Sequence, residues 1–148
     1  MIYLGADHKG YKLKEVIKNY LSGFGYKFED LGNKIFDKED DYVDFAEVVA
    51  KKVVKNANNR GVLFCGSGTG MMIAANKIAG ARAIVGFSEK IVKLSRQHND
   101  SNILSIPSDF LKEKEAVKII KVWLSEKFSK EKRHIRRIKK IEKIEKQK

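Results

Sequence analysis

Residues 61–78, GVLFCGSGTGMMIAANKI, contain the transition around which the rest of the chain is organised. The apolar run at 61–65 predicts a buried strand, and the amphipathic run at 71–78 predicts a helix. Three glycines lie in the short loop that joins them, where a tight strand-to-helix turn is expected. A strand that passes directly into a helix is the building unit of parallel α/β proteins.

The same alternation of short apolar runs and amphipathic segments continues in both directions. Strands are predicted at 1–6, 26–32, 61–65, 81–87 and 102–106. Helices are predicted at 12–23, 42–56, 71–78, 88–97, about 109–126 and about 130–146. Right-handed crossovers then predict a three-layer, Rossmann-like, doubly wound sheet of five parallel strands. We expect the strand order 2-1-3-4-5, with ligands at the carboxyl ends of the first and third strands.

Composition indicates one domain over residues 1–148, since the chain has no repeat and no linker-like segment. No apolar run approaches the roughly 18 residues of a membrane span, and the one cysteine cannot form an internal disulfide. We therefore expect a cytoplasmic protein. The net charge is +12, and the basic segment at about 127–148 carries +8 of it, from eleven Lys or Arg and three Glu. Charge concentrated in a tail is a weak indication of nucleic-acid binding.

The loop after the third predicted strand differs from the common phosphate-binding motifs. Gly70 is followed by Met71 and Met72, whereas a P-loop requires Lys and then Ser or Thr. The dinucleotide fingerprint also fails, because it needs a glycine at position 71. Free N–H groups in the loop, together with the helix end, would hold an anion or an oxygen that gains negative charge. A tight turn without a ligand is the alternative interpretation.

Cys65 ends the third predicted strand and lies beside the start of a helix. The positive end of a helix favours a thiolate, so we expect a lowered pKa and a candidate base or nucleophile. A buried cysteine that acts only as a small hydrophobic residue is the alternative. A redox role is disfavoured because no second cysteine is present to resolve an oxidised one. Asp7 and His8 follow the first predicted strand and should share the crevice with Cys65.

The chain has three histidines, His8, His98 and His134, each within a polar stretch. A metal site that uses all three is an alternative to surface or capping roles, although their spacing is not typical of metal ligands. His98 ends the helix that follows the fourth strand, so it should lie at the other end of the sheet from Cys65. If His98 is catalytic, the partner subunit of a two-fold dimer would have to supply it.

The basic tail has an apolar stripe and one pair of arginines on a common face. Ile135, Ile138, Ile141 and Ile144 recur every three residues, which predicts a helix that packs on the body or on a partner subunit. Arg133 and Arg137, one turn apart, are placed to hold a phosphate group. A nucleic-acid-binding arm is the alternative function of this helix.

Five segments together resemble the ribose-5-phosphate isomerase B and galactose-6-phosphate isomerase family. They are GADHKGYKLK (5–14), DY (41–42), CGSGTGMMIAANKIAGARA (65–83), SRQHNDSNIL (95–104) and RHIRR (133–137). The resemblance implies a cofactor-free and metal-free aldose–ketose isomerase that acts on a sugar phosphate. It also implies a homodimer, or a dimer of dimers, with active sites shared between subunits.

The resemblance assigns a role to each matching position. Cys65 would move a proton between C2 and C1, Ser67 would assist it, and His98 would open the sugar ring. The enediolate oxygen would be held by backbone groups of the loop, which belong to Gly66, Gly68, Thr69 and Gly70. The remaining matches would bind the substrate: Asp7, Asn99 and Tyr42 along the sugar, and His8, Arg133 and Arg137 at the phosphate.

Asp109 departs from the family pattern, which usually has an arginine in contact with the phosphate at this position. An acid there should repel a phosphate, whereas the replacement of proline by Val43 should alter only a loop. Ribose 5-phosphate and ribulose 5-phosphate are the expected substrates. The alternatives are galactose 6-phosphate or another hexose phosphate and, in a different functional class, a nucleic-acid- or nucleotide-binding module without catalysis.

Overall fold

The computed structural model describes residues 1–147, which contain five strands and six helices. The strands are β1 (Ile2–Ala6), β2 (Phe28–Asp30), β3 (Arg60–Cys65), β4 (Ala83–Val85) and β5 (Ile103–Pro107). The helices are α1 (Tyr11–Gly23), α2 (Tyr42–Val53), α3 (Thr69–Ala75), α4 (Glu89–Asn99), α5 (Glu113–Ser125) and α6 (Lys132–Glu145). Each strand and helix predicted from the sequence is therefore present, with ends that shift by a few residues.

The five strands form one parallel sheet in the order β2-β1-β3-β5-β4. The expected order 2-1-3-4-5 is wrong for the last two strands. β5 lies between β3 and β4, and the three-residue β4 forms an edge. The connection from β4 to β5 therefore reverses direction along the sheet, and a right-handed crossover places α4 on the opposite face from α3.

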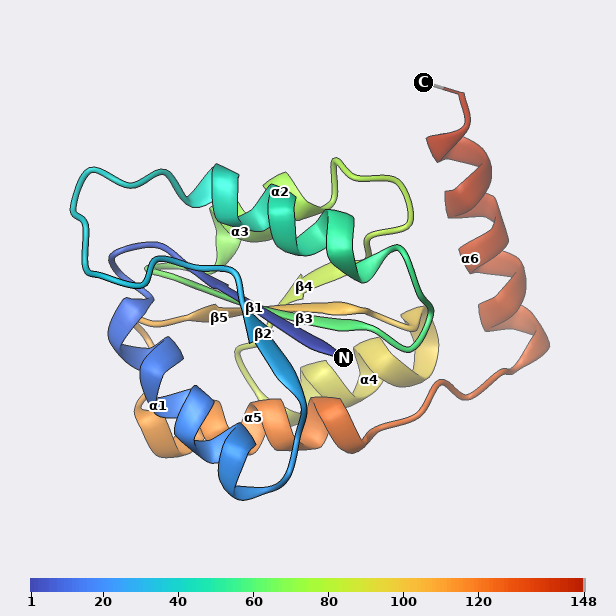
Figure 1. Ribbon diagram of the computed structural model, residues 1–148. Coiled ribbons are helices and arrows are strands. Elements are labelled where there is room, and N and C mark those ends of the chain that lie inside the picture. Colours follow the sequence, from blue (N-terminus) through green and yellow to red (C-terminus); the bar gives the residue numbers. More distant parts are fainter. Residues whose placement is uncertain (148) are drawn as a thin grey trace.

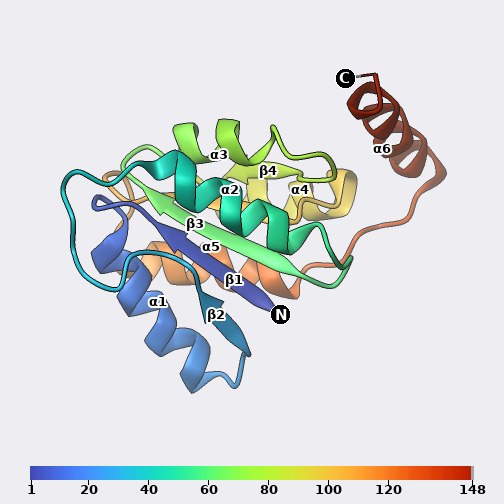
Figure 2. The ribbon, with the colours of Figure 1, turned by 45° about the horizontal axis from the view of Figure 1, so that its top comes forward.

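Two layers of helices cover the sheet, with α2 and α3 on one face and α1, α4 and α5 on the other (Figures 1 and 2). Each face has its own cluster of buried side chains. Phe64, Leu104 and Trp123 belong to the cluster beneath α1, α4 and α5. Leu63 and Met71 belong to the cluster beneath α2 and α3. Successive residues of β3 thus alternate between the two faces, as the pleat of a strand requires.

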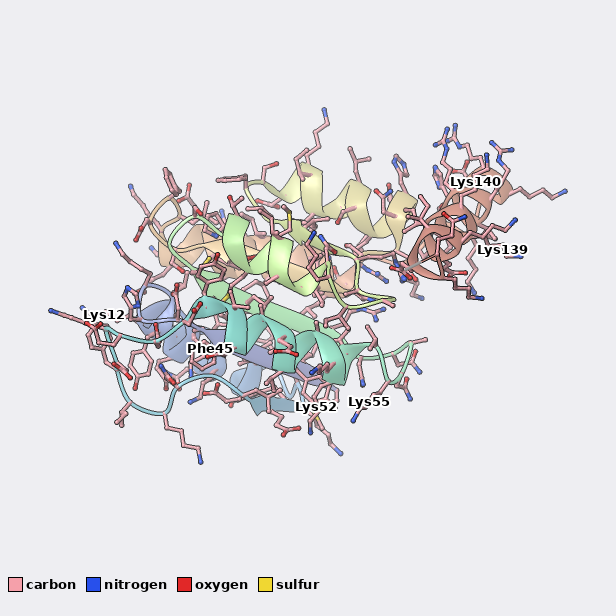
Figure 3. All side chains as sticks on the ribbon, turned by 90° about the horizontal axis from the view of Figure 1, so that it is seen from above. Lys12, Phe45, Lys52, Lys55, Lys139 and Lys140 are labelled. Atoms are coloured by element: carbon pink, nitrogen blue, oxygen red, sulfur yellow. The ribbon has the colours of Figure 1, made fainter. Side chains whose placement is uncertain are left out.

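Helix α6 stands apart from the layered body (Figure 1). A segment at 126–131 leads to it from α5, and its first turn contacts the end of α4. Near its end, the Glu145 carboxylate accepts a hydrogen bond from the backbone N–H of Gly80, at 3.0 Å. Its isoleucine stripe is partly open to solvent, with Ile141 42% and Ile144 61% exposed. Lys139 and Lys140 extend outward from the same helix (Figure 3).

Candidate active site

Asp7 and Cys65 lie at the carboxyl ends of the neighbouring strands β1 and β3. The backbone N–H of Asp7 donates to the carbonyl of Phe64 at 3.2 Å, which ties the two strand ends together. On the other side of β3, the N–H of Ser108 donates to the carbonyl of Cys65 at 2.9 Å. The convergence of Asp7, His8 and Cys65 at one end of the sheet agrees with the expectation from the sequence.

The glycine loop is held in one shape by its own backbone and by β5. Gly68 has a φ of +74°, a conformation that favours glycine, and a side chain there would also crowd Val85. The Ser105 hydroxyl donates to the Gly68 carbonyl at 2.7 Å from a fully buried position. Ser67 accepts a hydrogen bond from the N–H of Thr69 at 3.3 Å. Sequence reasoning missed Ser105, which lies in an otherwise apolar strand.

Two side chains from distant segments border this loop. A Cβ added to Gly70 would lie 2.7 Å from ring carbons of Tyr42, so the tyrosine packs directly on the loop. A Cβ added to Gly66 would lie 2.8 Å from the carboxylate of Asp109. Asp109 also forms an ion pair with Lys9 at 3.6 Å. The acid that departs from the family pattern therefore lies at the mouth of the crevice, partly neutralised by a lysine.

Burial sets the protonation of the Cys65 thiol. The side chain is 4% exposed, and this burial raises its pKa. The N–H groups of Met71, Gly68 and Ser67 act in the opposite direction, while the carboxylate of Asp7 raises the pKa further. The expectation of a lowered pKa is therefore wrong for the chain alone, because loss of hydration outweighs the N–H groups at the helix start.

Asp7 is itself buried beside the thiol, at 6% exposed. Burial raises the pKa of its carboxyl group, and the hydrogen bond from the N–H of Gly10, at 2.9 Å, lowers it. Nearby charges contribute in both directions, since His8 lowers this pKa and Asp40 raises it. Two acidic groups, Asp7 and Cys65, thus share a poorly hydrated space in which negative charge is costly.

His8 is oriented by a carboxylate that sequence reasoning missed. Its backbone N–H and its ring Nδ1 both contact Oδ1 of Asp40, at 3.0 and 2.7 Å. Asp40 belongs to the polar segment at 33–41, which has no hydrophobic periodicity to reveal its position. A cavity of about 550 Å³ opens beside the imidazole, and its other lining residues are Lys9, Lys12, Phe36 and Lys38. The three lysines make this cavity suitable for an anion, although the imidazole itself is held by a carboxylate.

The other four predicted site residues lie at the opposite end of the sheet. His98 and Asn99 end α4, where the Asn99 carbonyl accepts a hydrogen bond from Arg82 at 3.0 Å. Strand β3 has six residues, so Cys65 and the amino end of the sheet are about 17 Å apart. Arg133 and Arg137 are exposed residues of α6, and Figure 1 shows this helix beside the same distant end of the sheet. Within one chain these four residues do not meet Cys65 or His8.

The three histidines do not gather at one point. His98 and His134 stack with ring centroids 4.4 Å apart, whereas His8 follows β1 at the other end of the sheet. Among residues 1–147, no three His, Cys, Asp or Glu side chains lie close enough together to hold a metal ion. No helix in this part of the chain is long and apolar enough to cross a membrane.

The fold and this arrangement of residues define the chain as an α/β protein with a buried thiol above a glycine-rich, N–H-lined loop. The profile of the ribose/galactose isomerase family matches residues 2–141. The probable ribose-5-phosphate isomerase B of Mycoplasma genitalium is 42% identical over 128 residues, which is 86% of this chain and 84% of the relative. The ribose-5-phosphate isomerase B of Mycobacterium tuberculosis is 36% identical over 135 residues, covering 91% of this chain and 83% of the relative.

Solved structures give the same result. The crystal structure of ribose-5-phosphate isomerase B from Mycoplasma genitalium with bound ribulose-5-phosphate superposes with a TM-score of 0.95 at 42% identity. It covers 99% of this chain and 97% of that structure. The enzyme from Clostridium thermocellum gives a TM-score of 0.91 at 40% identity, with coverage of 99% and 97%. The chain belongs to the ribose/galactose isomerase family. Its enzyme class is therefore that of the sugar-phosphate isomerases.

Proposed function

We propose that this chain interconverts ribose 5-phosphate and ribulose 5-phosphate through an enediolate. The observation that carries the proposal is the position of the Cys65 thiol, buried beside Asp7 and directly above the glycine loop. The relatives at 36–42% identity are named as isomerases of this pentose phosphate, which favours it over a hexose phosphate.

The chemistry assigns the proton transfer to Cys65. As a thiolate it removes the proton from C2 of the open-chain aldose, and the C2–H electrons move to form the C1–C2 double bond. The carbonyl oxygen on C1 thereby becomes an enediolate oxygen. The Cys65 thiol then returns the proton to C1, and the proton of the C2 hydroxyl moves to the oxygen on C1, which gives the ketose. The raised pKa of Cys65 makes the thiolate a stronger base once it forms.

The N–H groups of residues 66–70 would stabilise the enediolate oxygen. The loop is already fixed by the hydrogen bond from Ser105 to Gly68 and by the packing of Tyr42 against Gly70. Preorganised donors need no rearrangement as charge develops, and loss of one such donor costs about 2.7–4 kcal/mol in other enzymes. The Ser67 hydroxyl accepts a hydrogen bond from the N–H of Thr69 and so helps to hold this part of the loop in place.

Ring opening requires a second subunit in this proposal. His98 and Asn99 lie too far from Cys65 of the same chain to touch a common pentose. A two-fold dimer brings the amino end of one sheet to the carboxyl end of the other, and the exposed isoleucines of α6 offer an apolar contact. His98 of the partner subunit then moves a proton between O1 and the ring oxygen. Arg133 and Arg137 of the partner subunit join His8 at the phosphate.

Deuterium exchange measured by NMR tests the reaction. The protein is incubated with ribose 5-phosphate in deuterium oxide, in parallel with Cys65→Ala. We expect deuterium to enter the sugar with the wild type and not with the variant. Cys65→Ser serves as a matched control that keeps a hydroxyl in place of the thiol, and its exchange should be far slower. Exchange at the wild-type rate in Cys65→Ala would contradict the role of the thiol, and no exchange with any protein would contradict the substrate.

A further inference from the structure

The carboxylate of Asp40 is almost completely withdrawn from solvent and uses both of its oxygens. Its side chain is 5% exposed. Oδ1 accepts from the backbone N–H and from the ring of His8, and Oδ2 accepts from the side-chain amide of Asn33 at 2.6 Å. A buried carboxylate with three hydrogen bonds is held in one orientation. The His8 ring that it contacts is therefore fixed as well.

A buried lysine supports this arrangement from helix α1. The ammonium group of Lys14, whose side chain is 0% exposed, donates to the carbonyl of Asn33 at 3.0 Å and to Asp30 at 2.5 Å. The Tyr11 hydroxyl donates to the carbonyl of Lys34 at 3.1 Å from the start of the same helix. The segment that carries Asn33 and Asp40 is thus attached to α1 at two points.

The contact with Asp40 fixes which ring nitrogen of His8 carries hydrogen. A carboxylate only accepts hydrogen bonds, so Nδ1 must carry the hydrogen that it donates. In a neutral imidazole the other nitrogen, Nε2, then has no hydrogen and cannot donate to a phosphate oxygen. A hydrogen bond between Nε2 and an oxygen of a phosphate dianion therefore requires one more proton, which lies between these two atoms.

We propose that Asp40 is a positioning residue that makes anion capture at His8 depend on the uptake of one proton. The inference rests on the proposed function, because it takes the phosphate of the substrate as the bound anion. The proton comes from solvent and bonds to Nε2, and the resulting imidazolium lies between the Asp40 carboxylate and the phosphate. Hydrogen bonds in which the donor or the acceptor is ionised are about twice as strong as neutral ones.

The other charged groups around His8 also favour protonation of Nε2 once an anion is present. Asp7 and Asp40 face the imidazole from the carboxyl end of β1 and from the segment at 33–41. Lys9, Lys12 and Lys38 line the same cavity and repel an imidazolium. Binding of a phosphate dianion offsets those lysine charges, so the proton and the phosphate assist one another.

Calorimetry in buffers of different ionisation enthalpy counts the protons. Ribose 5-phosphate is titrated at pH 8 into Cys65→Ala, which binds without turnover. We expect uptake of about one proton per site, and a Kd that rises about tenfold per pH unit in the alkaline range. The same titration with Asp40→Asn should show little uptake, because an amide can donate to Nδ1 and leave hydrogen on Nε2. Binding without uptake in the Cys65→Ala protein, or no binding, would overturn the proposal.

A matched variant separates the loss of Asp40 from a loss of charge. Asp37→Asn removes one negative charge from the same segment, and within residues 1–147 the only hydrogen bond of the Asp37 carboxylate is from the N–H of Glu39. In the background of the active enzyme, Asp40→Asn should raise KM by about tenfold with little change in kcat, whereas Asp37→Asn should change neither. Equal effects of the two variants would overturn the proposal. An unchanged unfolding midpoint in Asp40→Asn excludes a purely structural loss.

Nitrogen NMR of the free protein gives a readout that does not depend on the substrate. The His8 signals are assigned by comparison with His8→Gln. At pH 8 we expect hydrogen on Nδ1 in the wild type, and hydrogen on Nε2 in Asp40→Asn. Hydrogen on Nε2 in the wild type would overturn the proposal even if the enzyme isomerises ribose 5-phosphate. Conversely, failure of deuterium exchange would contradict the reaction while leaving this measurement intact.

Discussion

His98 and His134 stack against one another where α4 meets α6, with ring centroids 4.4 Å apart and planes inclined by 38°. Nδ1 of His134 is hydrogen-bonded to the hydroxyl of Ser129 at 2.8 Å, and the ring is 2% exposed. Burial lowers the pKa of His134, Glu131 opposes this effect, and the neighbouring His98, Arg133 and Arg137 lower the pKa further. The proposed ring-opening histidine is therefore held by a second imidazole that resists protonation.

Acid should loosen the attachment of α6. A histidine whose folded-state pKa is lowered stabilises the fold above its ordinary value of 6.5, and that stability is lost as pH falls below it. We expect the amides at the start of α6 to exchange hydrogen faster at pH 5.5 than at pH 7.5, after correction for intrinsic rates. His134→Phe keeps a ring against His98 and should remove most of this pH dependence. An equal acid response in both proteins would contradict the prediction.

Mixed subunits test the shared active site. Cys65→Ala and His98→Ala should each be inactive alone, because every site lacks either the base or the ring-opening group. After co-refolding, heterodimers contain one site with both defects and one intact site. Random pairing of equal amounts should restore about a quarter of wild-type activity. Activity that stays at the level of the separate variants would contradict the dimer arrangement.

The activity of the enzyme at saturating substrate should increase with pH well beyond neutrality. Burial raises the pKa of Cys65, so only a small fraction is thiolate at pH 7, and this fraction grows about tenfold per pH unit. The acid limb of kcat, measured with saturating substrate so that the proton uptake at His8 is complete, should therefore lie above the ordinary range for a thiol. Alkylation of Cys65 by iodoacetamide should follow the same limb. A plateau reached below pH 8 would show that the thiol is instead favoured as thiolate.

Gly10 should tolerate no side chain. A Cβ at this position would lie 2.1 Å from the carbonyl oxygen of Phe64, in the backbone of the central strand β3. We expect Gly10→Ala to lower the free energy of unfolding by about 3 kcal/mol, measured with urea. At the other end of the same helix, a Cβ added to Gly23 would meet no other atom within 4 Å. Gly23→Ala is the control and should be neutral or stabilising by up to about 1 kcal/mol.

Asp109→Arg should improve the binding of a sugar phosphate. Asp109 lies beside Gly66 at the mouth of the crevice, and its carboxylate pairs with Lys9. Replacement by arginine removes a repulsive charge and adds an attractive one, which should lower KM about threefold for such an exposed position. Glu47→Arg, which makes the same charge change on α2, should leave KM unchanged. An unchanged or higher KM in Asp109→Arg would contradict the prediction.

The sequence predicted the strands and helices because short apolar runs alternate with segments in which apolar residues repeat about every 3.6 positions. It did not predict that β5, and not β4, lies next to β3 in the sheet. Both strand orders satisfy right-handed crossovers, and the choice between them depends on which strand can be buried on both faces. All five residues of β5 are buried, whereas two of the three in β4 are partly exposed. Such burial depends on packing against α3 on one face and α5 on the other, which no local pattern encodes.

The candidate site was predicted in part for a similar reason. Cys65, Asp7 and His8 follow directly from strand ends, so topology alone brings them together. Asp40 approaches His8 from 32 positions away through an irregular segment, and only the folded chain shows the contact. The pKa of Cys65 was predicted with the wrong sign because a helix end is visible in a sequence, whereas the loss of hydration is not.

Burial of Cys65 also has a consequence for how long the protein survives in an oxidising cell. Peroxides attack thiolates and not neutral thiols, and they must reach the sulfur to do so. The raised pKa and the 4% exposure both slow this attack when no substrate is bound. The chain has no second cysteine that could reverse an oxidation, so this protection of the resting thiol slows the loss of active molecules.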